Sequence, residues 1–209
     1  MSACTRPGRV LGCDVALRHA GVVLLDEAGA VVTAWALVKG AADAKALALA
    51  GVRVQRVPHA EQEASGPQAD LLRLCTLRGW LDTVAGEARA QGATGAVLEG
   101  VAFHRGTSQA AVASLYQAHA VARLALADAG IPHDVVEPST ISRTLHGGRR
   151  LAKGMGKMET ARVVRERWGQ VWPGDGEGDV ADAYVLARVV CGSHPGRGGD
   201  PREGGRVRR

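Results

Sequence analysis

The sequence predicts an α/β protein in which a central, mixed, five-stranded sheet is flanked by helices. Three segments rich in Val and Leu follow one another near the start of the chain, which is typical of an antiparallel meander. After them, segments with a helical period alternate with short apolar segments. That alternation is typical of parallel strands joined by crossover helices, so both kinds of strand pairing are expected in one sheet.

The meander is predicted over residues 10–13, 21–25 and 30–38, and "DEAG" at 26–29 supplies the second turn. The stretch 39–66 is Ala-rich and then polar, and indicates little beyond a short helix at 44–50. We interpret it as a variable insertion.

The crossover part begins with a helix over 68–91, where apolar residues recur at the spacing of one helical face. A short buried strand at 95–100 follows, then a helix over 107–128 that Gly130 and Pro132 end, and a strand within 132–138. Beyond a Gly- and Arg-rich loop at 146–156, helices are predicted at 157–168 and 179–190.

A chain of 209 residues is long enough for one sizeable core, which we place in a single domain over 1–192. The tail 193–209 is basic, nearly devoid of apolar residues and expected to be disordered. The four cysteines form no Cys-x-x-Cys pair, which argues against a zinc site or a disulfide framework. The longest apolar run, 28–38, is shorter than the roughly 20 residues of a membrane span, and no secretory signal is apparent. We expect a cytoplasmic protein without a membrane partner.

Two acids follow apolar segments directly: Asp14 in "VLGCD" and Glu99 in "GAVLE". The ends of neighbouring parallel strands lie about 4.8 Å apart, so these carboxylates are predicted to meet. An ionised carboxylate is costly to bury without a cation or hydrogen bonds. Taken alone, each acid also fits an ordinary strand end or turn.

Asp179 and Asp182 are three residues apart and therefore share one face of the last predicted helix. If that helix packs beside the strand ends, four carboxylates surround one small volume that suits Mg²⁺, with Mn²⁺ as a substitute. Two such ions activate water for phosphodiester hydrolysis and stabilise the leaving 3′ oxygen. The alternative is a simple helix-capping pair.

Five segments together resemble the RuvC family of Holliday junction resolvases, within the RNase H-like superfamily: "LGCDVALRHAGVVLLD", "AVLEGVAF", "VVEPSTI", "GMGKMETARVV" and "DVADAYVLA". The resemblance implies an RNase H-like fold, a homodimer, and metal-dependent paired cuts in four-way DNA junctions. It assigns the metal-binding acids to Asp14, Glu99, Asp179 and Asp182. Ala16 and Ala20 depart from the family's pattern, which commonly has Gly or Ser and then Thr at these places.

The resemblance also implies a residue that wedges between bases, for which Phe103 is the candidate, with a plain core position as its alternative. It implies a basic residue at the scissile phosphate, for which Lys157 and Arg143 are the candidates. The net charge of +5 is concentrated in 143–167, and Arg149, Arg150 and Lys153 lie in its glycine-rich loop. Such residues bind phosphates with little sequence preference, unless they form only a solvated surface.

The sequence therefore predicts a Mg²⁺-dependent, homodimeric endonuclease that resolves Holliday junctions and other branched DNA. Two alternatives remain open at this stage. One is a nuclease of the same superfamily that acts on RNA–DNA hybrids or flaps, and the other is a junction-binding protein without catalysis.

Overall fold

The computed structural model describes residues 8–63, 65–101, 108–146, 156–176 and 178–191. These residues form a six-stranded sheet with the order β4-β3-β2-β1-β5-β6. The strands are β1 (Arg9–Val15), β2 (Ala20–Leu25), β3 (Val31–Val38), β4 (Arg53–Arg56), β5 (Ala93–Glu99) and β6 (His133–Val136). The helices are α1 (Ala41–Leu49), α2 (His59–Glu63), α3 (Pro67–Ala90), α4 (Gln109–Asp128), α5 (Pro138–His146), α6 (Gly156–Trp168) and α7 (Asp179–Val190).

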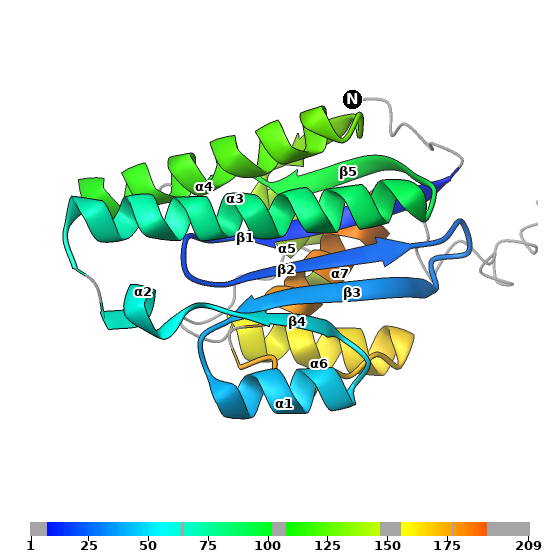
Figure 1. Cartoon of the computed structure of the whole chain (residues 1–209). Coiled ribbons are helices and arrows are strands. Elements are labelled where there is room, and N and C mark those ends of the chain that lie inside the picture. Colours follow the sequence, from blue (N-terminus) through cyan, green and yellow to red (C-terminus); the bar gives the residue numbers. More distant parts are fainter. Residues whose placement is uncertain (1–7, 64, 102–107, 147–155, 177, 192–209) are drawn as a thin grey trace, which may run out of the picture.

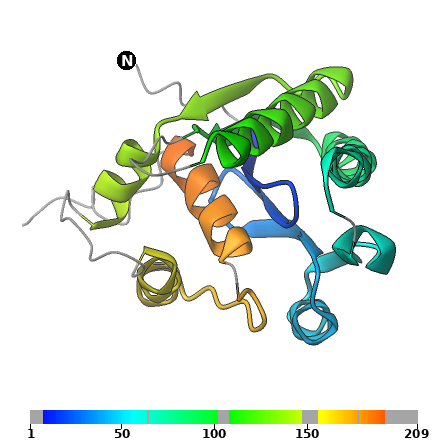
Figure 2. The same ribbon diagram turned by 90° about the vertical axis from the view of Figure 1, so that its left-hand side faces the viewer.

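The molecule has three layers, with the sheet in the middle (Figures 1 and 2). One apolar core lies between the sheet and the pair α3 and α4. A second core lies on the opposite side of the sheet, where α7 packs with α1, α5 and α6. Residues that alternate along β1 enter the two cores in turn: Leu11 and Cys13 face α3 and α4, whereas Val10 faces α7.

The mixed pairing has the predicted form. β1 and β2, and β2 and β3, are antiparallel, whereas β5 is parallel to both β1 and β6. The predicted α/β class with a mixed sheet and flanking helices is therefore confirmed.

The predicted number of five strands is wrong, because a sixth strand lies within the stretch 39–66. β4 pairs in parallel with β3, from Trp35 with Arg53 to Val38 with Arg56. Its sequence, "RVQR", is polar apart from one half-buried valine. β4 lies at the edge of the sheet, where most of its side chains are exposed to solvent. It therefore lacks the apolar signal of the inner strands.

Two glycines let α7 lie directly on the sheet. A Cβ on Gly12 of β1 would stand 1.9 Å from the backbone oxygen of Ala183 in α7. A Cβ on Gly21 of β2 would stand 2.3 Å from the backbone oxygen of Asp179. α7 consequently packs closely on the central strands along its length, and its first turn lies at the β1–β2 hairpin.

Helix α5 was not predicted as a helix, and it follows β6 at once from Pro138. Its start at proline suits the first helical turn, where the missing N–H has no partner to lose. Across the described ranges, none of the helices combines the length and apolarity needed to cross a membrane. The tail 193–209 lies outside the described residues, and the domain limits stay predictions.

Candidate active site

The first two acids lie on neighbouring strands. Asp14 is on β1 and Glu99 ends β5, and the two strands run parallel with Cys13 paired to Leu98. One further step along this register places Asp14 beside Glu99, on strands about 4.8 Å apart. Cys13 and Leu98 belong to the core under α3 and α4. Because residues alternate between faces, Asp14 and Glu99 both face the α7 side of the sheet.

The first turn of α7 is placed at this point of the sheet. Gly21 is the cross-strand partner of Asp14, and the backbone of Asp179 lies against it. Asp179 is 5 % exposed and Asp182 is half-buried, and both belong to this first turn. The structure therefore brings the helical pair to the same hairpin, and the same face of the sheet, as Asp14.

The N-terminus of α7 is capped by a residue that the sequence analysis missed. The carboxylate of Asp175 accepts hydrogen bonds from the backbone N–H groups of Val180, at 3.3 Å, and Ala181, at 2.9 Å. Asp175 satisfies N–H groups that a helix otherwise leaves without partners in its first turn. The capping role that the sequence left open for Asp179 and Asp182 is thus filled, at these two N–H groups, by Asp175.

Asp179 has a partner on the β1–β2 hairpin. The ring nitrogen Nδ1 of His19 lies 2.7 Å from Oδ2 of Asp179. The side chain of Asp179 is 7 % exposed and that of His19 is 28 % exposed, so solvent only partly screens the contact. His19 could not be assigned a role from the sequence, because a single histidine in a turn has no distinctive spacing.

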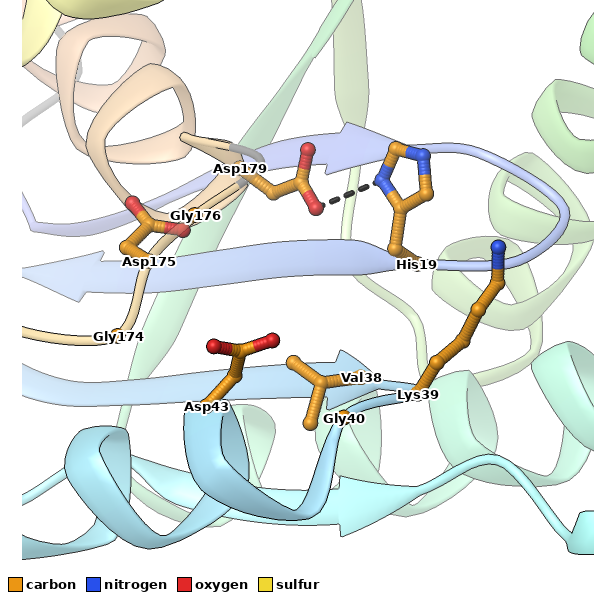
Figure 3. Close-up of a pocket in the computed structure, with 9 residues that line it drawn as sticks. All are labelled: His19, Val38, Lys39, Gly40, Asp43, Gly174, Asp175, Gly176 and Asp179. Atoms are coloured by element: carbon orange, nitrogen blue, oxygen red, sulfur yellow. Dashed lines mark hydrogen bonds and ion pairs between the residues drawn. The ribbon is translucent and has the colours of Figure 1, made fainter.

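A pocket adjoins this pair (Figure 3). It is a cavity of about 80 Å³ between the segment 38–43, which joins β3 to α1, and the segment 174–176 before α7. His19 and Asp179 form part of its lining, and Lys39 and Asp43 line it from the segment 38–43. Gly174 fits closely against α1, since a Cβ there would stand 2.6 Å from the Cβ of Ala46. The pocket therefore depends on the stretch 39–66.

The candidate acids suit a divalent metal by their chemistry. All four are carboxylates, and oxygen ligands of this kind are preferred by Mg²⁺ and Mn²⁺. Within the described part of the chain, no three or more His, Cys, Asp or Glu side chains are gathered closely enough to hold a metal ion as they stand. The fit thus rests on the ligand type and on the shared side of the sheet.

The thiol of Cys13 lies next to Asp14 in sequence but on the other side of the sheet. Burial in the apolar core, and to a smaller extent the negative charge of Asp14, raise the pKa of Cys13 to about 12. Cys13 is therefore a neutral core residue at physiological pH.

The predicted DNA-binding residues are only partly described. Lys157 lies in the first turn of α6 and Arg143 lies in α5, but their side chains are outside the description. Phe103, Arg149, Arg150 and Lys153 lie outside the described residues. On α6, the guanidinium of Arg162 is paired with both Glu159 and Glu166, which reduces the positive charge that this helix presents.

The fold is an α/β protein with a mixed sheet, in which an antiparallel meander continues into parallel strands and carboxylates lie on one face of the sheet. Two solved structures of RuvC from Thermus thermophilus are similar to this chain. RuvC in complex with a Holliday junction substrate is 16 % identical, with a TM-score of 0.56, and the match covers 87 % of this chain and 90 % of that one. A second RuvC structure is 22 % identical, with a TM-score of 0.53, and the match covers 87 % and 92 %.

No protein-family model matches the chain, and no curated protein matches it either. The structural likeness confirms the RuvC-like fold that the sequence segments predicted. At these identities it is a statement about the fold.

Proposed function

We propose that the chain is a divalent-metal-dependent endonuclease that cuts branched DNA, above all four-way junctions, by phosphodiester hydrolysis. One observation carries this proposal: Asp14 and Glu99 face the same side of adjacent central strands, where the first turn of α7 brings in Asp179. Asp179 is buried, and Asp14 and Glu99 are half-buried. Carboxylates that are withdrawn from water need hydrogen bonds, charged partners or a metal.

The four acids are carried by different kinds of secondary structure, which supports a division of roles. Asp14 and Glu99 are held by inner strands of the sheet, and we assign them to a fixed part of the metal site. Asp179 and Asp182 come from α7 and complete it. A bound Mg²⁺ pair would supply the charge that activates a water and stabilises the leaving 3′ oxygen.

The basic residues are assigned to the DNA. We assign Lys157 to the scissile phosphate, and we assign Arg143, Arg149, Arg150 and Lys153 to phosphates along the arms. Such contacts give salt-dependent binding with little sequence preference. Phe103 is assigned to the bases at the crossover. The likeness to RuvC bound to a Holliday junction substrate supports branched DNA as the ligand.

Two copies of the chain are proposed to act on one junction. A symmetric dimer presents two identical sites related by a two-fold axis, which matches the need for paired cuts on opposite strands. The net charge of +5 on each chain is consistent with a polyanionic ligand for such a dimer.

A junction-binding protein without catalysis is the second candidate. It is supported by the likeness to RuvC in complex with a Holliday junction substrate, which bears on the ligand and not on hydrolysis. The two candidates agree on the ligand and differ on hydrolysis and on the need for a metal.

The test is a cleavage assay with a synthetic four-way junction, a linear duplex and an RNA–DNA hybrid, each with Mg²⁺ and with EDTA. We expect paired nicks in the junction with Mg²⁺ alone. Cleavage confined to the hybrid would overturn the assignment of substrate. Junction binding with no cuts under any metal would favour the second candidate.

Two matched variants make the assay specific. Asp14→Asn is expected to abolish cutting while the affinity for the junction is retained. Asp43→Asn changes an acid in the nearby pocket that we do not assign to the metal, and it is expected to leave the cutting rate within about two-fold of the wild type. Equal activity of Asp14→Asn and the wild type would contradict the proposal.

A further inference from the structure

His19 is held so that its ring reaches α7. The residue ends the turn between β1 and β2, and its backbone oxygen accepts a hydrogen bond of 3.0 Å from the N–H of Ala16. Ala20, the next residue, pairs with Val15 in the strand ladder. The position of the His19 backbone is therefore fixed by the same strand that carries Asp14.

The hydrogen bond between His19 and Asp179 controls the orientation of a carboxylate. An aspartate carboxylate accepts hydrogen bonds, so Nδ1 of His19 is the donor to Oδ2 in this contact. Fixing Oδ2 also fixes the plane of the carboxylate and hence the direction of Oδ1. The contact joins the hairpin directly to the first turn of α7 (Figure 3).

Capping of the helix does not require Asp179 in this orientation. The carboxylate of Asp175 already accepts hydrogen bonds from the backbone N–H groups of Val180 and Ala181. The 2.7 Å contact with His19 is thus a link between two elements rather than part of the helix end. Its loss leaves these two capping hydrogen bonds of α7 in place.

The pocket leaves open space beside the carboxylate of Asp179. Asp179 and His19 both line this cavity of about 80 Å³. A carboxylate at the edge of a cavity that opens to solvent gains hydration by turning into it. The hydrogen bond from His19 holds Oδ2 in place and so opposes that rotation.

We propose that His19 is a positioning residue that orients the carboxylate of Asp179 for metal binding. The inference rests on the proposed function, because Asp179 is assigned there to the metal. His19 acts through Asp179 and is not itself assigned as a ligand. Hydrogen-bond partners of metal ligands commonly change metal affinity by about 10- to 100-fold when they are removed.

The experiment uses three variants of the full chain at this position. In His19→Asn the amide nitrogen lies as many bonds from Cβ as Nδ1 does in histidine, so the donor is retained. In His19→Gln the donor lies one bond further out, and in His19→Leu it is absent. His59→Leu is the matched control, because the His59–Glu63 pair is 3.6 Å apart with side chains 78 % and 73 % exposed.

Mn²⁺ binding is measured by calorimetry without DNA, together with the thermal midpoint and the single-turnover rate on the four-way junction. We expect His19→Leu to weaken Mn²⁺ binding at least about 10-fold and to slow cutting, with unchanged junction affinity. The Mn²⁺ affinity of His19→Asn is expected to stay within about three-fold of that of the wild type. It is also expected to be higher than the Mn²⁺ affinity of His19→Gln. His59→Leu is expected to match the wild type.

The outcomes separate this inference from the proposed function. If the wild type binds Mn²⁺ and cuts the junction, but His19→Leu binds Mn²⁺ equally well, the positioning role is overturned and the proposed function stands. Equal losses in the Asn and Gln variants also overturn it, and this comparison holds even if His19→Leu does not fold. A wild type that binds no Mn²⁺ overturns both.

Discussion

Gly21 and Asp179 are in direct backbone contact, although they are far apart in the sequence. A Cβ on Gly21 would stand 2.3 Å from the backbone oxygen of Asp179 and 2.6 Å from the nitrogen of Val180. Gly21 also pairs with Asp14 across the hairpin. The absence of one side chain therefore sets how closely the helical acids approach the acid on β1.

Gly21→Ala is expected to destabilise the protein and to displace the start of α7. The contact is with backbone, which cannot move aside as a flexible side chain can, so overpacking should cost about 1–3 kcal/mol or more. Chemical denaturation checks the free energy of unfolding, and cleavage of the four-way junction reports the displacement.

Gly79→Ala is the matched control for this substitution. Gly79 lies in α3, and a Cβ there meets nothing within 4 Å. Alanine in a helix is favoured over glycine by about 0.5–1 kcal/mol, so this variant should be slightly more stable than the wild type. A Gly21→Ala protein as stable as Gly79→Ala would show that α7 does not rest on β2 as described.

Glu87 is expected to make stability depend on pH in the acid range. Its carboxylate accepts a hydrogen bond of 2.8 Å from the indole N–H of Trp35 and one of 2.6 Å from Arg53. These contacts, the indole first, lower the pKa of Glu87 below its ordinary value of 4.5. Because the folded state favours the ionised form, this stabilisation is present above pH 4.5 and is lost as the pH falls through the lowered pKa.

The measurement is the urea midpoint between about pH 3 and 7 for the wild type and for Glu87→Gln. The variant should be less stable near neutrality and should lose less stability on acidification. Glu27→Gln, at an exposed position in the β2–β3 turn, is the control and should follow the wild type. Parallel curves for all three proteins would contradict the role given to Glu87.

The sheet could be predicted from the sequence where a strand is buried on both faces. β1, β2, β3 and β5 are mostly apolar because both cores contact them. β4 could not be predicted, since Val54 is its one apolar residue and the strand lies at an edge. β4 is defined by its pairing with β3, which depends on the whole fold.

Cys13 is expected to resist thiol reagents in the folded protein. Burial raises its pKa to about 12, so it remains a neutral thiol without access to solvent at about pH 8, whereas Cys75 is exposed. Peptide mapping after alkylation should find Cys75 modified and Cys13 unmodified until the protein is denatured. Modification of both at similar rates would contradict the packing of β1.

The same thiol predicts a loss of stability in alkali. The neutral form is favoured in the folded state, so its contribution is complete below the ordinary pKa of 9.0 and is lost as the pH rises towards about 12. Cys13→Ala removes the ionisable group, and its unfolding free energy should fall less steeply over this range. Equal slopes for the two proteins would show that Cys13 is not buried as a neutral thiol.

The candidate site was only partly predictable. Asp14 and Glu99 could be found because each directly follows an apolar run, and their shared face follows from the strand register. Asp175 could not be identified as the cap of α7, because "DGEGD" offers several acids near the helix start. The contact of His19 with Asp179 joins residues 160 positions apart and is visible only in the folded chain.

The central claim is that Asp14, Glu99 and the first turn of α7 hold divalent metal. Anomalous diffraction from crystals soaked with Mn²⁺ tests it most directly, since it locates the ion without reference to activity. We expect a peak about 2.2 Å from carboxylate oxygens of both Asp14 and Glu99, on the α7 side of the sheet. Mn²⁺ peaks that lie elsewhere, with none at Asp14 and Glu99, would contradict the account.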